Sequence, residues 1–129
     1  MNRRTALATV VSLGVCLSFD PASAAGIKPY SGDTFAIAVD AGPVIVHVYA
    51  DWCLVCATQK PTLTNLSNDP KLANVQFIAV NFDKDKIFLK ANRIANQSVI
   101  VAFKNGKEIL RLSGTTDAAQ IRDAVMKVL

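Results

Sequence analysis

The sequence predicts a single α/β domain in which helices cover both faces of a central mixed sheet of four to five strands. Apolar runs of β-forming residues alternate with segments typical of helices, an order that favours parallel strands. The last two strand-like runs are separated by Asn105-Gly106, a dipeptide typical of the two-residue type I′ hairpin turn. We therefore expect parallel strands first and an antiparallel hairpin last.

Five segments rich in β-branched and aromatic residues account for the strands. The segment 43–50 is almost continuously apolar, which is typical of a central strand buried on both faces. The expected strands span residues 27–30, 43–50, 75–82, 99–103 and 108–112.

Four helices are expected between and after these strands, over residues 31–40, 53–67, 85–92 and 116–129. Either Ser31 or Asp33 would cap the first helix, because both side chains accept hydrogen bonds from free helical N–H groups. Pro61 should kink the second helix, because proline removes a helical hydrogen bond. Thr116 would cap the last helix.

The N-terminus has the organisation of a secretory signal peptide. Arg3-Arg4 forms a basic start, an apolar stretch follows, and Ala22-Ser23-Ala24 is an A-x-A cleavage site. We therefore expect a signal peptide over residues 1–24, a mature domain over residues 25–129, and a periplasmic or secreted protein. An uncleaved membrane anchor is the alternative, although the apolar stretch is shorter than the roughly 20 residues that a span needs.

Cleavage of the signal peptide would change the cysteine count and the charge. Cys16 would be removed, so that Cys53 and Cys56 become the only cysteines. In an oxidising compartment, such a pair is either a structural bridge or a redox couple. The formal net charge of +4 would fall to +3, because two arginines and one aspartate are removed. This mild charge, without a basic stripe interleaved with aromatic residues, gives no reason to expect nucleic-acid binding.

The spacing of Cys53 and Cys56 suits thiol–disulfide chemistry, because the predicted second helix starts at the first of them. Residues i and i+3 of a first helical turn lie on one face, so the two sulfurs can form a disulfide. The free N–H groups and the dipole of that turn stabilise a thiolate, the form that attacks disulfides. Cysteines at such sites have thiol pKa values of roughly 3.5–7.5, compared with about 8.5 for a free cysteine.

Several motifs besides the cysteine pair occur in a characteristic order along residues 34–129. They are Tyr49-Ala50-Asp51-Trp52-Cys53, Pro61 in the following helix, Asn81-Phe82-Asp83 at the end of the next strand, Phe103-Lys104-Asn105-Gly106 at the hairpin, and Gly114 before the last helix. On these motifs the chain resembles the thioredoxin superfamily. The first motif is especially similar to the C-terminal domain of the periplasmic thiol:disulfide interchange reductase.

The resemblance implies a thioredoxin-like fold for residues 25–129 and a protein-disulfide oxidoreductase that needs no bound cofactor or metal. Cys53 would attack the disulfide of a protein substrate as a thiolate, and Cys56 would resolve the mixed disulfide. The similarity to the reductase domain favours a reductase or an electron relay over an oxidase. A membrane or soluble thiol is then implied as the electron donor. We expect the protein to act as a monomer.

The chain departs from the family pattern at three places around the cysteines. Leu54-Val55 replaces the usual Gly-Pro or Pro-His, a dipeptide that tunes the redox potential in the family. His47 stands in place of a buried aspartate, and Ala79 stands in place of its lysine partner. Ser98 stands in place of the family's cis-proline. Because a cis bond before a residue other than proline costs about 2.5–4 kcal/mol, we expect a trans Gln97–Ser98 bond.

Three residues near the cysteines have both a structural and a functional interpretation. His47 is either a half-buried strand residue or the proton acceptor for Cys56 during resolution, a task that suits a pKa near 6.5. Trp52 is either part of the core or, as the resemblance favours, an apolar contact surface for substrate. Ser98 is either a plain loop residue or, as the resemblance implies, a neighbour of Cys53 whose hydroxyl binds a substrate backbone or the thiolate.

A second class of function would use the same two thiols without turnover. The resemblance implies that the cis-proline keeps metals off the cysteine pair in the family, so its absence here would permit copper(I), zinc or an iron–sulfur cluster to bind. Zinc needs four ligands, or three and a water, whereas the mature chain offers two cysteines and one histidine. A metal- or partner-binding module is therefore the alternative, and a redox-inactive relative is a third interpretation. We favour the oxidoreductase.

Overall fold

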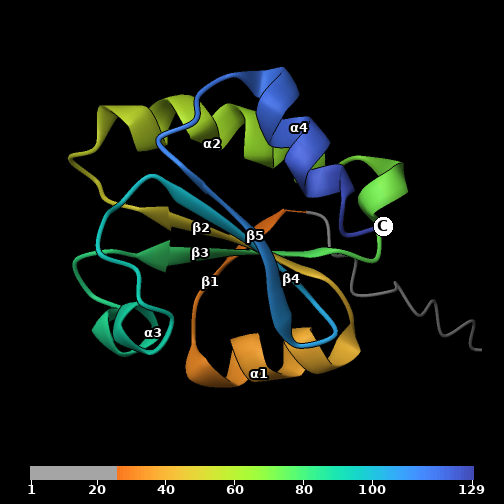
Figure 1. Cartoon of the computed structure of the whole chain (residues 1–129), viewed down its shortest axis with the longest axis horizontal. Helices are drawn as coiled ribbons and strands as arrows, with labels where there is room; N and C mark the ends of the chain where they lie inside the picture. Colours follow the sequence, from red (N-terminus) through yellow and green to blue (C-terminus); the bar gives the residue numbers. More distant parts are fainter. Residues whose placement is uncertain (1–25) are drawn as a thin grey trace, which may run out of the picture.

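The computed structural model describes residues 26–129, so the predicted signal peptide and its cleavage site lie outside the described residues. Figure 1 shows a central sheet between two pairs of helices. The helices α1 (Gly32–Ala41) and α3 (Lys86–Ala91) cover one face of the sheet, and α2 (Leu54–Ser67) and α4 (Ala118–Met126) cover the other. A short 3-10 helix, η1 (Pro70–Leu72), follows α2. Among the helices formed by residues 26–129, none has the length and apolar character of a membrane span.

The sheet has five strands in the order β1-β3-β2-β4-β5. The strands are β1 (Ile27–Pro29), β2 (Val44–Tyr49), β3 (Gln76–Asn81), β4 (Val99–Lys104) and β5 (Lys107–Ser113). β3 pairs in parallel with both β1 and β2, whereas β4 pairs antiparallel with β2 and with β5. The predicted mixed sheet is therefore confirmed.

The hairpin between β4 and β5 has the predicted turn. Asn105 and Gly106 have φ angles of 53° and 74°. A type I′ turn requires positive φ at both central positions, and asparagine and glycine tolerate this conformation best.

The central strand β2 is buried on both faces, as its apolar sequence predicts. Val44, Val46 and Val48 point into the core beneath α1 and α3, whereas Ile45 points into the core beneath α2 and α4. Side chains alternate between the two faces of a strand. His47 therefore lies on the α2 side of the sheet, which is also the side of the cysteines.

Two of the helix caps test the predictions from the sequence. Ser31 caps α1, because its hydroxyl accepts a hydrogen bond from the Thr34 N–H. The prediction that Thr116 caps the last helix is wrong. The carboxylate of Asp117 accepts a hydrogen bond from the Gln120 N–H over 2.8 Å, so α4 begins one residue later.

The fold brings three segments together at one end of the sheet. β2 ends at Tyr49, and a short loop leads from it into Cys53 at the start of α2. Ser98 directly precedes β4, which runs antiparallel to β2. The Ser98 N–H donates to the carbonyl oxygen of Val48 over 2.9 Å, so the Ser98 loop is fastened beside the end of β2.

Candidate active site

Cys53 and Cys56 form a disulfide at the N-terminus of α2, with their Cα atoms 5.3 Å apart. Cys53 is the N-cap residue of the helix. The Cys56 N–H donates to the sulfur of Cys53 over 3.1 Å. One free N–H of the first turn is therefore aimed at the sulfur that the sequence predicts to be the nucleophile, an arrangement that stabilises a thiolate there.

Ser98 lies against both sulfurs, as the resemblance implied for Cys53. Its Oγ atom is 3.1 Å from the Cys53 sulfur and 3.3 Å from the Cys56 sulfur. Residues 26–129 contain no cis peptide bond, so the predicted trans Gln97–Ser98 bond is confirmed. The Ser98 backbone instead adopts a left-handed conformation with φ of 64°. The side chain in place of the family's proline is thus a polar contact to the disulfide.

His47 is only 4% exposed, so it is more deeply buried than the half-buried residue that we expected as its structural interpretation. Its Nε2 atom lies 3.0 Å from Oε1 of Gln59. Burial lowers the pKa of His47 below its ordinary value of 6.5, the hydrogen bond to Gln59 opposes this, and the Lys60 ammonium lowers the pKa further. The imidazole is therefore neutral at neutral pH and able to accept a proton.

Gln59 was not identified from the sequence, although it connects the histidine to the rest of the site. It is fully buried in α2. Its Nε2 atom donates to the carbonyl oxygens of Ser98 and Thr115, over 3.1 and 2.9 Å. The available signal was its position on the apolar face of the helix, three residues after Cys56 and four before Leu63, where an amide is unusual.

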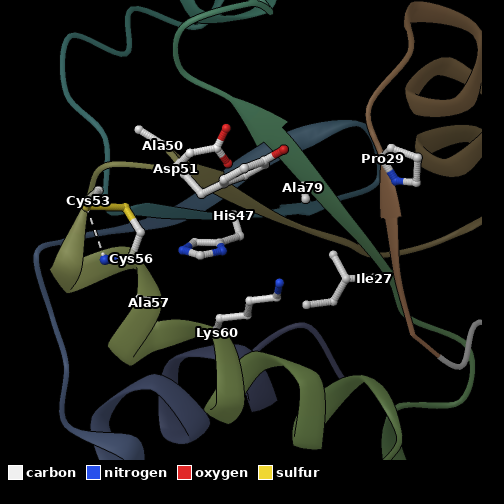
Figure 2. A pocket seen from close by; sticks show the side chains of 11 residues that line it. Ile27, Pro29, His47, Ala50, Asp51, Cys53, Cys56, Ala57, Lys60 and Ala79 are labelled. Carbon is white, nitrogen blue, oxygen red and sulfur yellow. Dashed lines mark hydrogen bonds between the residues drawn. A yellow bond between two sulfur atoms is a disulfide. The ribbon is translucent and has the colours of Figure 1, made fainter.

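A cavity of about 460 Å³ opens beside the disulfide. Figure 2 shows His47 extending into it from β2, and Cys56 and Lys60 extending into it from α2. The remaining lining residues are mostly small or apolar: Ile27, Pro29, Tyr49, Ala50, Asp51, Cys53, Ala57 and Ala79. The histidine and the second cysteine therefore line one cavity that has room for several waters, because a single water needs only about 30 Å³.

The surface around Cys53 is apolar. Trp52 is 60% exposed, and its indole N–H donates to Oδ2 of Asp83 over 2.9 Å. This hydrogen bond holds the ring at the surface rather than in the core. Leu54 and Val55, between the cysteines, are also exposed. Three exposed apolar side chains therefore lie next to Cys53 along the chain.

The chain matches the sequence model of the thioredoxin family over residues 26–127. The chain belongs to the thioredoxin family. It is similar to the thioredoxin of Chlamydia pneumoniae, with 26% identity over 78% of this chain and 97% of that protein. It is also similar to the crystal structure of Trxlp from Edwardsiella tarda, with 37% identity and a TM-score of 0.74 over 77% of this chain and 97% of the other. The structure of Malassezia sympodialis thioredoxin gives 25% identity and a TM-score of 0.71 over 80% of this chain and 91% of the other.

Family membership and geometry agree on the chemistry. A thioredoxin-family chain whose Cys53-x-x-Cys56 pair closes a disulfide at a helix N-terminus is a thiol–disulfide oxidoreductase. Within residues 26–129, no three His, Cys, Asp or Glu side chains converge in a metal-binding arrangement. The thioredoxin homologues and the Cys53–Cys56 pair at disulfide distance favour the oxidoreductase over the metal-binding alternative.

Proposed function

We propose that the protein is an exported disulfide reductase or electron relay that acts on protein disulfides through Cys53 and Cys56. The N–H of Cys56 aimed at the Cys53 sulfur is the observation that carries the assignment of Cys53 as the nucleophile. The preference for reduction rests on the similarity of residues 49–53 to the C-terminal domain of the interchange reductase. A membrane or soluble thiol would return the protein to its dithiol form.

The proposed reaction transfers two electrons from the dithiol to the substrate. The Cys53 thiolate attacks one sulfur of a substrate disulfide, forms a mixed disulfide and releases the other substrate sulfur as a thiolate. Cys56 then loses its proton and attacks the Cys53 sulfur. This step forms the Cys53–Cys56 disulfide, and the second substrate sulfur leaves as a thiolate. The substrate gains the two electrons that the pair has lost.

His47 is the proposed acceptor of the Cys56 proton. The ring is neutral at neutral pH, because burial lowers its pKa, and it lines the same cavity as Cys56. A water in that cavity can carry the proton between them.

The His47→Gln variant tests this role, because it keeps an N–H for Gln59 but has no basic nitrogen. We expect the rate at which Cys56 displaces a chromogenic thiol from Cys53 to fall roughly 100-fold or more, measured by stopped flow. An unchanged rate would refute this role.

The apolar patch of Trp52, Leu54 and Val55 is the proposed docking surface for substrate. Exposed apolar patches beside a reactive group mark contact sites for other proteins. Ser98 would complete the site by donating its hydroxyl to the Cys53 thiolate or to a substrate backbone. Its position at 3.1 Å from that sulfur supports the contact to the thiolate and places the hydroxyl where a substrate would approach Cys53.

Insulin reduction with dithiothreitol tests the central proposal. The full chain should accelerate the reaction, and Cys53→Ser should abolish the acceleration. Cys16→Ser is the matched control, because it removes a cysteine of the predicted signal peptide and should leave turnover unchanged. Turnover that survives Cys53→Ser would overturn the assignment. The equilibrium potential then gives the direction, since a value near about −270 mV marks a reductant and one near about −120 mV an oxidant.

Export is proposed from residues 1–24 alone. A protein purified from the periplasmic fraction of an expression host should begin at Ala25 by N-terminal sequencing. Recovery of the intact chain in the membrane fraction would instead support an uncleaved anchor. Gel filtration of the mature protein should give the mass of a monomer.

A further inference from the structure

The orientation of the Gln59 amide is set by two backbone carbonyls. Its Nε2 atom lies 3.1 Å from the oxygen of Ser98 and 2.9 Å from the oxygen of Thr115. If the amide were reversed, its own oxygen would face two oxygens that carry no hydrogen. The NH₂ group must therefore point at the carbonyls, and both of its hydrogens are used there.

This orientation leaves Oε1 of Gln59 facing His47. The oxygen can only accept a hydrogen bond, so the Nε2 atom of His47, 3.0 Å away, must carry a hydrogen. A neutral imidazole has one N–H. When His47 is neutral, Nδ1 is therefore the nitrogen with the free lone pair.

The remaining nitrogen is in contact with the open cavity. In residues 26–129, no fully buried side-chain nitrogen or oxygen lacks a hydrogen-bond partner. The structure gives His47 Nδ1 no such partner within these residues, and His47 lines the cavity that Cys56 and Lys60 also line. The free lone pair is therefore on a part of the ring that is open to the cavity, where a water can carry a proton to it.

We propose that Gln59 is a positioning residue that holds His47 as its Nε2–H tautomer, makes Nδ1 the proton acceptor of the site, and ties this ring to the loop that places Ser98 on the sulfurs. The proposal rests on the proposed role of His47. Gln59 itself contacts neither cysteine sulfur and acts only through His47 and the Ser98 loop. One fully buried amide thereby connects the proton acceptor to the hydroxyl that contacts both cysteines.

The tautomer can be measured directly, because His47 is the only histidine of the chain. Long-range ¹H–¹⁵N correlation spectra of the ¹⁵N-labelled full chain, recorded above the pKa of His47, distinguish the two neutral tautomers. We expect a protonated Nε2 and an unprotonated Nδ1. A protonated Nδ1, or an average of both forms, would overturn the proposal. This readout requires no turnover, so it stands apart from the insulin assay that tests the proposed function.

Two substitutions of Gln59 distinguish its hydrogen bond with His47 from its hydrogen bonds to the two carbonyls. Gln59→Met removes all three hydrogen bonds at similar size, and should give a detectable Nδ1–H population and slower release of the chromogenic thiol from Cys53. Gln59→Glu keeps the acceptor for His47 but loses both donors to the carbonyls. It should retain the Nε2–H tautomer and shift the acid limb of the release rate to higher pH, because the carboxylate favours the imidazolium.

Gln120→Met on the exposed face of α4 is the matched control and should behave like the wild type in both measurements. A wild-type tautomer together with a wild-type release rate in Gln59→Met would refute the positioning role. If Gln59→Met does not fold, the spectrum of the wild-type protein decides the tautomer by itself. The groups that face His47 across the cavity, Lys60, Tyr49 and Asp51, stay unchanged in all of these variants.

Discussion

At the scale of a single residue, Ser98 shows how one departure from the family pattern changes the chemistry of the site. A hydroxyl within 3.1 Å of the Cys53 sulfur can donate to a thiolate. Hydrogen bonds to charged groups contribute about 1.5–3 kcal/mol, which corresponds to roughly one to two pH units. The thiolate titration of Cys53 in Ser98→Ala should therefore move up by that amount, measured by ultraviolet absorbance. Ser113→Ala, exposed on β5, is the control, and an unmoved titration would show that the hydroxyl does not stabilise the thiolate.

The backbone of Ser98 gives a separate prediction about stability. Its φ of 64° lies in the left-handed region, which costs residues with a Cβ atom about 1–2 kcal/mol relative to glycine. Ser98→Gly should therefore be more stable to urea than Ser98→Ala by about 1 kcal/mol. Both variants lose the hydroxyl, so their thiolate titrations should agree. At Ser113, within a strand, the order should reverse, because glycine weakens extended segments. The same order at both positions would contradict the left-handed conformation.

At the scale of the secondary-structure element, the start of α4 can be tested by capping. Asp117 accepts the hydrogen bond of the Gln120 N–H, whereas Thr116 makes no hydrogen bond in the described structure. Asp117→Ala should lower the free energy of unfolding by about 1 kcal/mol, and Thr116→Ala should change it little. Urea denaturation measures both. A larger loss in Thr116→Ala would restore the cap that the sequence predicts.

The elements themselves were largely predictable, whereas their contacts at the site were not. The apolar run of β2 and the Asn105-Gly106 turn are local patterns, and both produced the structure that they predict. The wrong cap of α4 arose because threonine and aspartate are adjacent and both can cap a helix. Gln59 and the left-handed Ser98 depend on three segments that are distant in sequence and meet only in the folded protein. Contacts between segments so far apart leave no periodic pattern in the sequence, so they could not be predicted from it.

At the scale of the whole molecule, the site lies at the edge of two separate cores. Each face of the sheet has its own apolar cluster, and the cysteines form a small third cluster with Ala50 at the end of β2. Polar groups at this end are satisfied by one another, since Gln59 joins His47 to two carbonyls. The fold can therefore hold a neutral histidine in its interior without using the charge of a partner.

That histidine makes the stability of the whole protein depend on pH. Burial lowers the pKa of His47 in the folded state, whereas the unfolded chain keeps a value near 6.5. The unfolded state therefore binds the proton first as the pH falls, and the stabilisation present above about pH 6.5 is lost between that pH and the lower folded pKa. In urea titrations, the contribution of His47 to the free energy of unfolding should not change with pH above about pH 6.5. It should decrease as the pH falls below that value.

The His47→Gln variant isolates this effect, because it removes the only histidine while keeping an N–H for Gln59. The unfolding free energy of the wild type minus that of this variant should fall as the pH drops from about 6.5 and become constant once His47 is charged in the folded state as well. Carboxylates that titrate at lower pH affect both proteins equally and cancel in the difference. A difference that stays constant from neutral pH downwards would mean that the folded histidine titrates like an exposed one, and would contradict the lowered pKa of the buried ring.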